Sequence, residues 1–125
     1  MPMYYDILFD KDSIMIIGVG CDICQISRLK HNFEKTAERL LTDNEYKIFS
    51  GFQSERRKIE FLAGRFSAKE AVVKALDVPM LIKNIEILND ENGKPYCTLD
   101  GYKIHISISH EREYSCAYAL CESTD

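Results

Sequence analysis

The chain has 125 residues, of which 46% are hydrophobic and 29% are charged, and its formal net charge is −4. This length and composition fit one domain over residues 1–125, and the acidic balance excludes a generally basic nucleic-acid-binding protein. No stretch approaches the roughly 18 consecutive apolar residues of a membrane span, so no membrane partner is expected. The five cysteines are odd in number and lack framework spacing, which favours a cytoplasmic protein over a disulfide scaffold.

Residues 1–13 mix acids with aromatic residues and are expected to be an N-terminal extension or an ill-defined start. A strand is predicted near residues 14–22, because residues 13–23 are apolar and rich in β-branched side chains. The two-residue period of a strand places Gly18, Gly20 and Asp22 on one face, where the glycines permit close approach by another backbone or a ligand. Asp22 is then either a metal ligand or a cap for the helix that follows.

Two helices are predicted near residues 25–39 and 42–50, and a longer helix near residues 55–76. In the long helix Glu70 lies within an apolar stripe, whose members are Ile59, Leu62, Phe66, Val73 and Leu76. Small residues gather on the opposite side, at Gly64, Ala68, Ala71 and Ala75. A carboxylate on an apolar face is costly unless a cation, a metal or several hydrogen bonds meet it. Glu70 is therefore a site residue, or the surface ion-pair partner of Lys74 four residues later.

Asp22 and Glu70 together form a plausible platform for Mg²⁺. This ion commonly takes one or two carboxylates, keeps several waters and completes its coordination with substrate phosphates. The two CxxC cysteines, Cys21 and Cys24, point to opposite faces of a continuing strand, which disfavours a zinc or redox role.

Four more strands are predicted near residues 84–90, 95–99, 103–109 and 114–122, with Asn92-Gly93 as a hairpin turn between the first two. Along the third of them His105, Ser107 and Ser109 alternate with isoleucines, and His110 follows. Such a polar face is a candidate for phosphate binding or proton transfer, although one wet face is also ordinary for an antiparallel strand. Helices grouped between strands predict an α+β fold with a mainly antiparallel sheet packed against the long helix.

The charges are unevenly distributed. Residues 47–74 hold seven bases against three acids, while acids dominate from residue 86 onward. The bases at 56–58 either solvate a helix start or form part of a patch for an acidic partner.

The chain resembles the holo-[acyl-carrier-protein] synthases, the small bacterial type of 4'-phosphopantetheinyl transferase. The resemblance runs from about residue 16 to residue 122. Five motifs in family order carry it: Gly-Val-Gly-Cys-Asp-Ile at 18–23, Glu-Arg-Leu-Leu-Thr at 38–42, Phe-Leu-Ala-Gly-Arg-Phe-Ser-Ala-Lys-Glu-Ala at 61–71 with Lys74-Ala75, Asn-Gly-Lys-Pro at 92–95, and Ile-Ser-Ile-Ser-His at 106–110.

The resemblance implies transfer of 4'-phosphopantetheine from coenzyme A to a serine of apo acyl carrier protein, in fatty acid biosynthesis. It implies that Asp22 and Glu70 hold Mg²⁺, and that Arg28 contacts the carrier protein. Residues expected to line the coenzyme A site are Arg65, Lys69, Lys74, Ser109 and His110. Of these, Lys74 and His110 join Glu70 as catalytic residues, and the base is left open between Glu70, a metal-bound water and His110 paired with Glu111. The implied assembly is a homotrimer with coenzyme A between subunits.

Two departures from the family pattern limit the transfer of these roles. Residues 76–84 form a short segment without glycine, so contacts to adenine are not predicted, and Glu111 stands where Asp or Thr is common. Two other classes remain open: another Mg²⁺-dependent phosphoryl-transfer enzyme, or a non-catalytic domain that binds carrier protein.

Overall fold

The computed structural model describes residues 15–124, so the predicted extension at residues 1–13 lies outside the described residues. Within that range, five strands form one antiparallel sheet in the order β1-β5-β4-β3-β2. Their bounds are β1 Ile16–Gln25, β2 Ile87–Asn89, β3 Pro95–Leu99, β4 Tyr102–His110 and β5 Tyr114–Ser123. The predicted α+β class with a mainly antiparallel sheet is confirmed.

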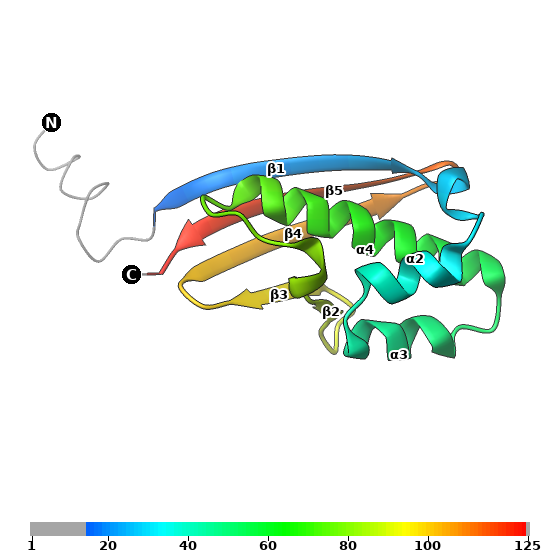
Figure 1. The fold of residues 1–125 in the computed structure, drawn as a ribbon. Helices are drawn as coiled ribbons and strands as arrows, with labels where there is room; N and C mark the ends of the chain where they lie inside the picture. The colour runs from blue at the N-terminus through cyan, green and yellow to red at the C-terminus, as the bar shows by residue number, and fades with distance from the viewer. Residues whose placement is uncertain (1–14, 125) are drawn as a thin grey trace, which may run out of the picture.

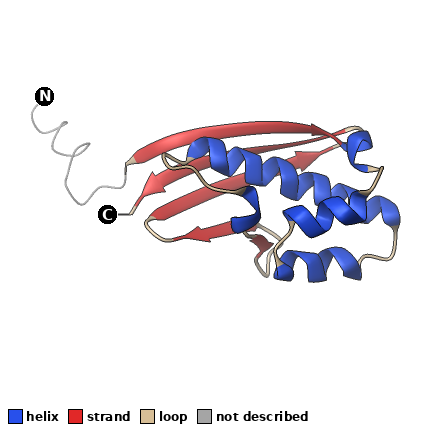
Figure 2. Ribbon diagram, in the orientation of Figure 1, coloured by secondary structure: helices blue, strands red, loops and turns tan. Residues whose placement is uncertain are grey.

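One face of the sheet is covered by the 21-residue helix α4 (Glu55–Ala75), as Figures 1 and 2 show. The shorter helices α2 (Phe33–Leu40) and α3 (Asp43–Gly51) lie against the N-terminal half of α4, with the start of α3 close to the edge strand β2. Two short 3₁₀ turns, η1 (Ile26–Leu29) and η2 (Ile82–Asn84), connect these elements. In the described part of the chain, no helix covers the other face of the sheet and none is long and apolar enough to cross a membrane.

The predicted helix near residues 25–39 is wrong in its extent. The chain forms η1, turns, and starts again as α2, because Asn32 at the start of α2 adopts the left-handed conformation with φ 59°. Asparagine is one of the few residues that visits this region readily, so it interrupts a helix at low cost. Helices α3 and α4 begin close to where they were predicted, and a side chain caps each one: Thr42 in a capping box and Ser54.

The most buried side of α4 is the side with the small residues. Ala68, Ala71 and Ala75 are at most 1% exposed and pack on the sheet, whereas Phe66 and Val73 of the apolar stripe are only half-buried. Close approach of helix and sheet thus depends on small side chains, and the stripe that holds Glu70 forms a partly open flank.

The hairpin predicted at Asn92-Gly93 is confirmed. Gly93 has φ 83°, and the carboxylate of Asp90 accepts hydrogen bonds from the backbone N–H of Asn92 and Lys94. All five cysteines are free thiols, and Cys21 is exposed while Cys24 is buried, as predicted for alternate faces of one strand. Burial raises the pKa of Cys97 to about 11, so this thiol behaves as a small apolar residue.

Candidate active site

Strand β1 approaches α4 so closely that only glycine fits at the contact. A Cβ atom on Gly20 would lie 1.9 Å from the carbonyl oxygen of Ala71, and one on Gly18 would lie 2.5 Å from that of Ala75. Asp22 follows on the same face of the strand, so its side chain is directed to the same helix. The prediction that Gly18, Gly20 and Asp22 share a face directed at a neighbouring backbone is confirmed.

Asp22 is linked to α4 by Lys74, whose Nζ lies 3.1 Å from Asp22 Oδ1 and donates to the carbonyl of Cys21 at 3.0 Å. The alternative reading of Asp22 as a cap is wrong, because β1 continues to Gln25 and the turn η1 has no side-chain cap. The alternative pairing of Lys74 with Glu70 is also wrong, because Lys74 pairs with Asp22 instead.

Glu70 is half-buried, and it makes no hydrogen bond or ion pair with any of residues 15–124. Strand β1 runs antiparallel to α4, since Gly18 meets Ala75 while Cys24 packs near Ala63. Asp22 lies between these two contacts along the strand, level with the turn of α4 that carries Glu70. Two carboxylates on facing elements, one of them without a protein partner, fit a cation.

The donor set suits Mg²⁺. No group of three or more His, Cys, Asp or Glu side chains that could hold a metal occurs among the described residues. A site with two carboxylates is what Mg²⁺ uses when water and substrate phosphates supply the other ligands. Asp22 and Glu70 would hold the ion, and Lys74 adds a fixed positive charge beside it.

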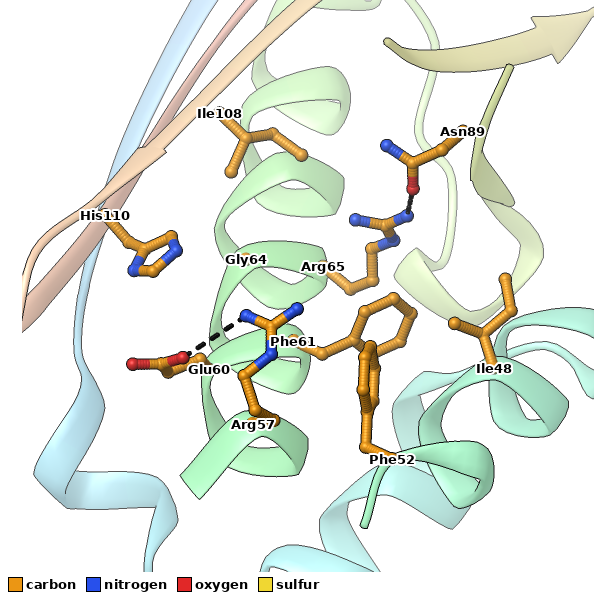
Figure 3. A pocket seen from close by; sticks show the side chains of 10 residues that line it. All are labelled: Ile48, Phe52, Arg57, Glu60, Phe61, Gly64, Arg65, Asn89, Ile108 and His110. Carbon is orange, nitrogen blue, oxygen red and sulfur yellow. Dashed lines mark hydrogen bonds and ion pairs between the residues drawn. The ribbon is translucent and has the colours of Figure 1, made fainter. Parts of the chain in front are cut away.

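A pocket of about 310 Å³ opens beside the N-terminal half of α4 (Figure 3). His110 from the end of β4 stands on one side of it with Arg57 and Glu60, and Arg65 stands on the other side with Asn89 from β2. The pocket brings together two of the residues predicted for coenzyme A, Arg65 and His110, although they are 45 positions apart in the sequence.

Both arginines in this pocket are held against aromatic rings. Arg57 lies 4.9 Å from the centre of the Phe52 ring, and Arg65 lies 4.4 Å from that of Phe61. Arg57 also pairs with Glu60 at 3.4 Å. Burial lowers the pKa of Arg65, and the nearby charge of Glu45 opposes that shift. Guanidinium groups fixed in this way are well suited to bind phosphate, because their orientation is set before the anion arrives.

Arg57, Glu60 and Asn89 were not predicted as site residues. Arg57 lies in the basic run at 56–58. The sequence alone did not decide whether these bases only solvate the start of a helix or bind an acidic partner. The residues around Asn89 in the sequence do not indicate a site, because Asn89 reaches the pocket only when β2 packs beside α4 in the folded chain.

Two predicted roles do not agree with the structure of the single chain, and a third is left open. The prediction that Lys69 lines the coenzyme A site is wrong, because Lys69 is fully buried with its Nζ 2.6 Å from Glu45 Oε1. The pairing of His110 with Glu111 is also wrong, because the Glu111 carboxylate accepts hydrogen bonds from the backbone of Glu113 and Tyr114. Ser109 lies on the open face of the sheet near Ile23, so its role stays a prediction.

Arg28 is exposed on η1, six residues beyond Asp22. It makes no hydrogen bond or ion pair within residues 15–124, so its charge is available to a partner. Its role in carrier-protein binding stays a prediction.

Comparison with known proteins identifies the family of this chain. The family model of the 4'-phosphopantetheinyl transferase superfamily matches residues 18–119. The chain belongs to this superfamily. Curated relatives named holo-[acyl-carrier-protein] synthase are 44% identical over 115 residues in Staphylococcus saprophyticus and 45% identical over 118 residues in Geobacillus sp.. The alignments cover 86% of this chain in both cases, and 99% and 98% of those relatives.

Solved structures agree with the sequence relatives. A holo-(acyl-carrier-protein) synthase from Bacillus anthracis, in complex with CoA (3',5'-ADP), matches with a TM-score of 0.81 and 39% identity, over 87% of this chain and 98% of that chain. The synthase from Neisseria meningitidis matches with a TM-score of 0.76 and 29% identity, over 87% and 100%. The resemblance noted from the motifs is confirmed, and so is the prediction that the chain is a phosphopantetheinyl transferase.

Proposed function

We propose that this chain transfers 4'-phosphopantetheine from coenzyme A to a serine of apo acyl carrier protein, with Mg²⁺, and supports fatty acid biosynthesis. The observation that carries the proposal is that two features lie along α4. Glu70 and Lys74 of the helix face Asp22 of β1 at one part, and a pocket with two arginines and His110 of β4 opens at another. Coenzyme A contains a pyrophosphate attached to a nucleotide. The two acids would hold the cation that binds the pyrophosphate, and the pocket would bind the phosphates of the nucleotide. The names of the relatives supply the substrate class.

In the proposed reaction, the serine Oγ of the carrier attacks the phosphorus that bears the pantetheine arm. A P–O bond forms, and the bond from that phosphorus to the bridging oxygen breaks. The electron pair stays on the 5'-phosphate of the leaving adenosine 3',5'-bisphosphate, and the serine proton passes to a base. Mg²⁺ held by Asp22 and Glu70 would orient the pyrophosphate and neutralise its charge.

The residues of this chain have separable roles in that step. Lys74 supplies fixed positive charge where negative charge develops on the leaving group. Arg57, Arg65 and His110 bind the phosphates of the nucleotide and hold it in register with the acids. Glu70 and His110 are the side chains that remain as candidates for the base, since Glu111 is engaged in its own turn.

The proposed assembly is a homotrimer formed through the open face of the sheet. Val19, Ile23 and Tyr118 on this face are 64%, 66% and 58% exposed, a group of large apolar side chains that a partner subunit would cover. Coenzyme A would then lie close to a subunit boundary. The proposed location is the cytoplasm, which suits five free thiols.

The experiment that tests the proposal measures release of adenosine 3',5'-bisphosphate from coenzyme A by chromatography, with and without apo carrier protein. The proposal expects release only when Mg²⁺ and apo carrier protein are both present. Release without carrier protein would indicate a phosphatase or nuclease that uses the same acids. Binding of carrier protein without any release would indicate a non-catalytic domain.

A further inference from the structure

A buried ion pair joins α3 to α4 beneath the pocket. Lys69 Nζ lies 2.6 Å from Glu45 Oε1, and both side chains are fully buried. Lys69 also donates to the carbonyl of Leu40 at 2.6 Å. Burial lowers the pKa of Lys69, and the hydrogen bond to Glu45 is the largest influence that opposes this shift. Buried pairs of this kind are often replaceable by apolar residues without loss of stability, so stability alone does not explain one.

The second carboxylate oxygen of Glu45 is connected to the pocket through the backbone of Ile87. Glu45 Oε2 accepts a hydrogen bond from the backbone N–H of Ile87 at 2.7 Å. The carbonyl of the same residue, Ile87, accepts from Arg65 Nε at 2.9 Å, and the Arg65 guanidinium also donates to the side chain of Asn89. One residue of β2 is thus held by two ionised side chains, one on α3 and one on α4.

Strand β2 is held by the buried side chain of Ile87, which packs in the core, and by its pairing with β3. It has three residues, forms the edge of the sheet and pairs only with β3 among the described residues. Core packing fixes the side chain of Ile87, and the bond to Glu45 fixes its backbone N–H at this edge strand. The carbonyl of the same residue orients the Arg65 guanidinium. Figure 3 shows that Arg65 and Asn89 form one wall of the pocket, opposite His110. The charge of Glu45 also favours the charged form of Arg65.

We propose that the Glu45–Lys69 pair is a positioning device for coenzyme A, which fixes Ile87 and so holds Arg65 at the pocket wall that receives a phosphate. This inference rests on the proposed function. Glu45 and Lys69 touch no substrate and act only through Arg65. Lys69 holds the Glu45 carboxylate in place through the buried ion pair.

The test is a double-mutant cycle measured as the Kd for coenzyme A by calorimetry, with thermal unfolding to confirm folded protein. The variant Glu45→Gln with Lys69→Met removes both charges and leaves no buried ion unpaired. Loss of one oriented charged contact should weaken binding about tenfold. In the background of Arg65→Lys, which cannot make the two-pronged contact, the same change should have little further effect.

The outcomes separate this inference from the function on which it rests. Equal losses in both backgrounds, or no loss in either, overturn the positioning role and leave the function intact. Unchanged affinity in Arg65→Lys itself overturns both the pocket assignment and the inference. If the double variant does not fold, Asn89→Ala takes its place, because Asn89 is exposed and holds the other end of Arg65. Affinity for coenzyme A within twofold of the unmodified protein would then overturn the proposal.

Discussion

Lys74 Nζ lies 3.1 Å from Asp22 Oδ1, across the contact where two glycines let β1 meet α4. The ion pair leaves Glu70, one turn earlier on the same helix, without a protein partner among the described residues. A paired acid beside an unpaired one is an arrangement that a divalent cation can complete, and the first prediction follows from it.

Glu70→Gln and Asp22→Asn should each lower kcat by roughly 100-fold or more, because each removes an anionic ligand, and even changes to the residues behind a ligand cost 10- to 100-fold. Both variants should fold, since neither side chain is in the core. The measurement is kcat as a function of Mg²⁺ concentration, with Glu55→Gln on the same helix as the charge-matched control. Normal turnover of Glu70→Gln at low Mg²⁺ would mean that Glu70 is not a ligand.

Arg28→Glu should raise the KM for carrier protein strongly and leave the KM for coenzyme A almost unchanged, because Arg28 is exposed and unpaired within the described residues. Salt should reduce the difference between the variant and the unmodified protein, since exposed charges are screened over about 10 Å at 0.1 M ionic strength. Lys94→Glu, on the hairpin turn, makes the same charge change as a control. Equal effects on both KM values would point to a folding or nucleotide-site defect instead.

His110→Ala should raise the KM for coenzyme A while the pH–rate profile keeps its shape, because His110 lines the pocket together with two arginines that would bind phosphate. Steady-state kinetics from pH 5 to pH 9, compared with His105→Ala on the open face, provide the measurement. A loss in kcat of more than about 100-fold at unchanged KM would assign proton transfer to His110.

Val19→Asp should convert a trimer into monomers, because it places a charge on the open apolar face of the sheet. Analytical ultracentrifugation measures the change, and Val78→Asp, which lies just beyond the end of α4, is the control. A trimer that withstands the Val19 substitution would require an interface elsewhere on the molecule.

The sequence predicted the elements whose local signals are strong. Gly18, Gly20 and Asp22 follow the period of a strand, and Asn92-Gly93 specifies a hairpin. The break at Asn32 was missed, because asparagine can adopt the left-handed conformation but is not restricted to it. Glu70 was singled out as a carboxylate on an apolar stripe, and it lies in the half-buried part of that stripe with Phe66 and Val73.

The parts of the site that were missed depend on tertiary contacts. Lys69 was assigned to the coenzyme A site from the family resemblance, as a member of the motif at residues 61–71. Glu70, the next residue of α4, is half-buried, whereas Lys69 is fully buried and pairs with Glu45. Nothing in the sequence near Glu45 indicates this pairing, because its position at the start of α3 is explained by the capping box alone. Asn89 likewise has a role only through its contact with Arg65.

The most direct test of the account is the intact mass of apo acyl carrier protein after incubation with coenzyme A, Mg²⁺ and this chain. We expect the carrier to gain the mass of one phosphopantetheine group, and a carrier with its acceptor serine changed to alanine to gain nothing. The Glu70→Gln variant should leave the carrier unmodified over the same period. An unchanged carrier mass with folded, unmodified enzyme would contradict the proposed function.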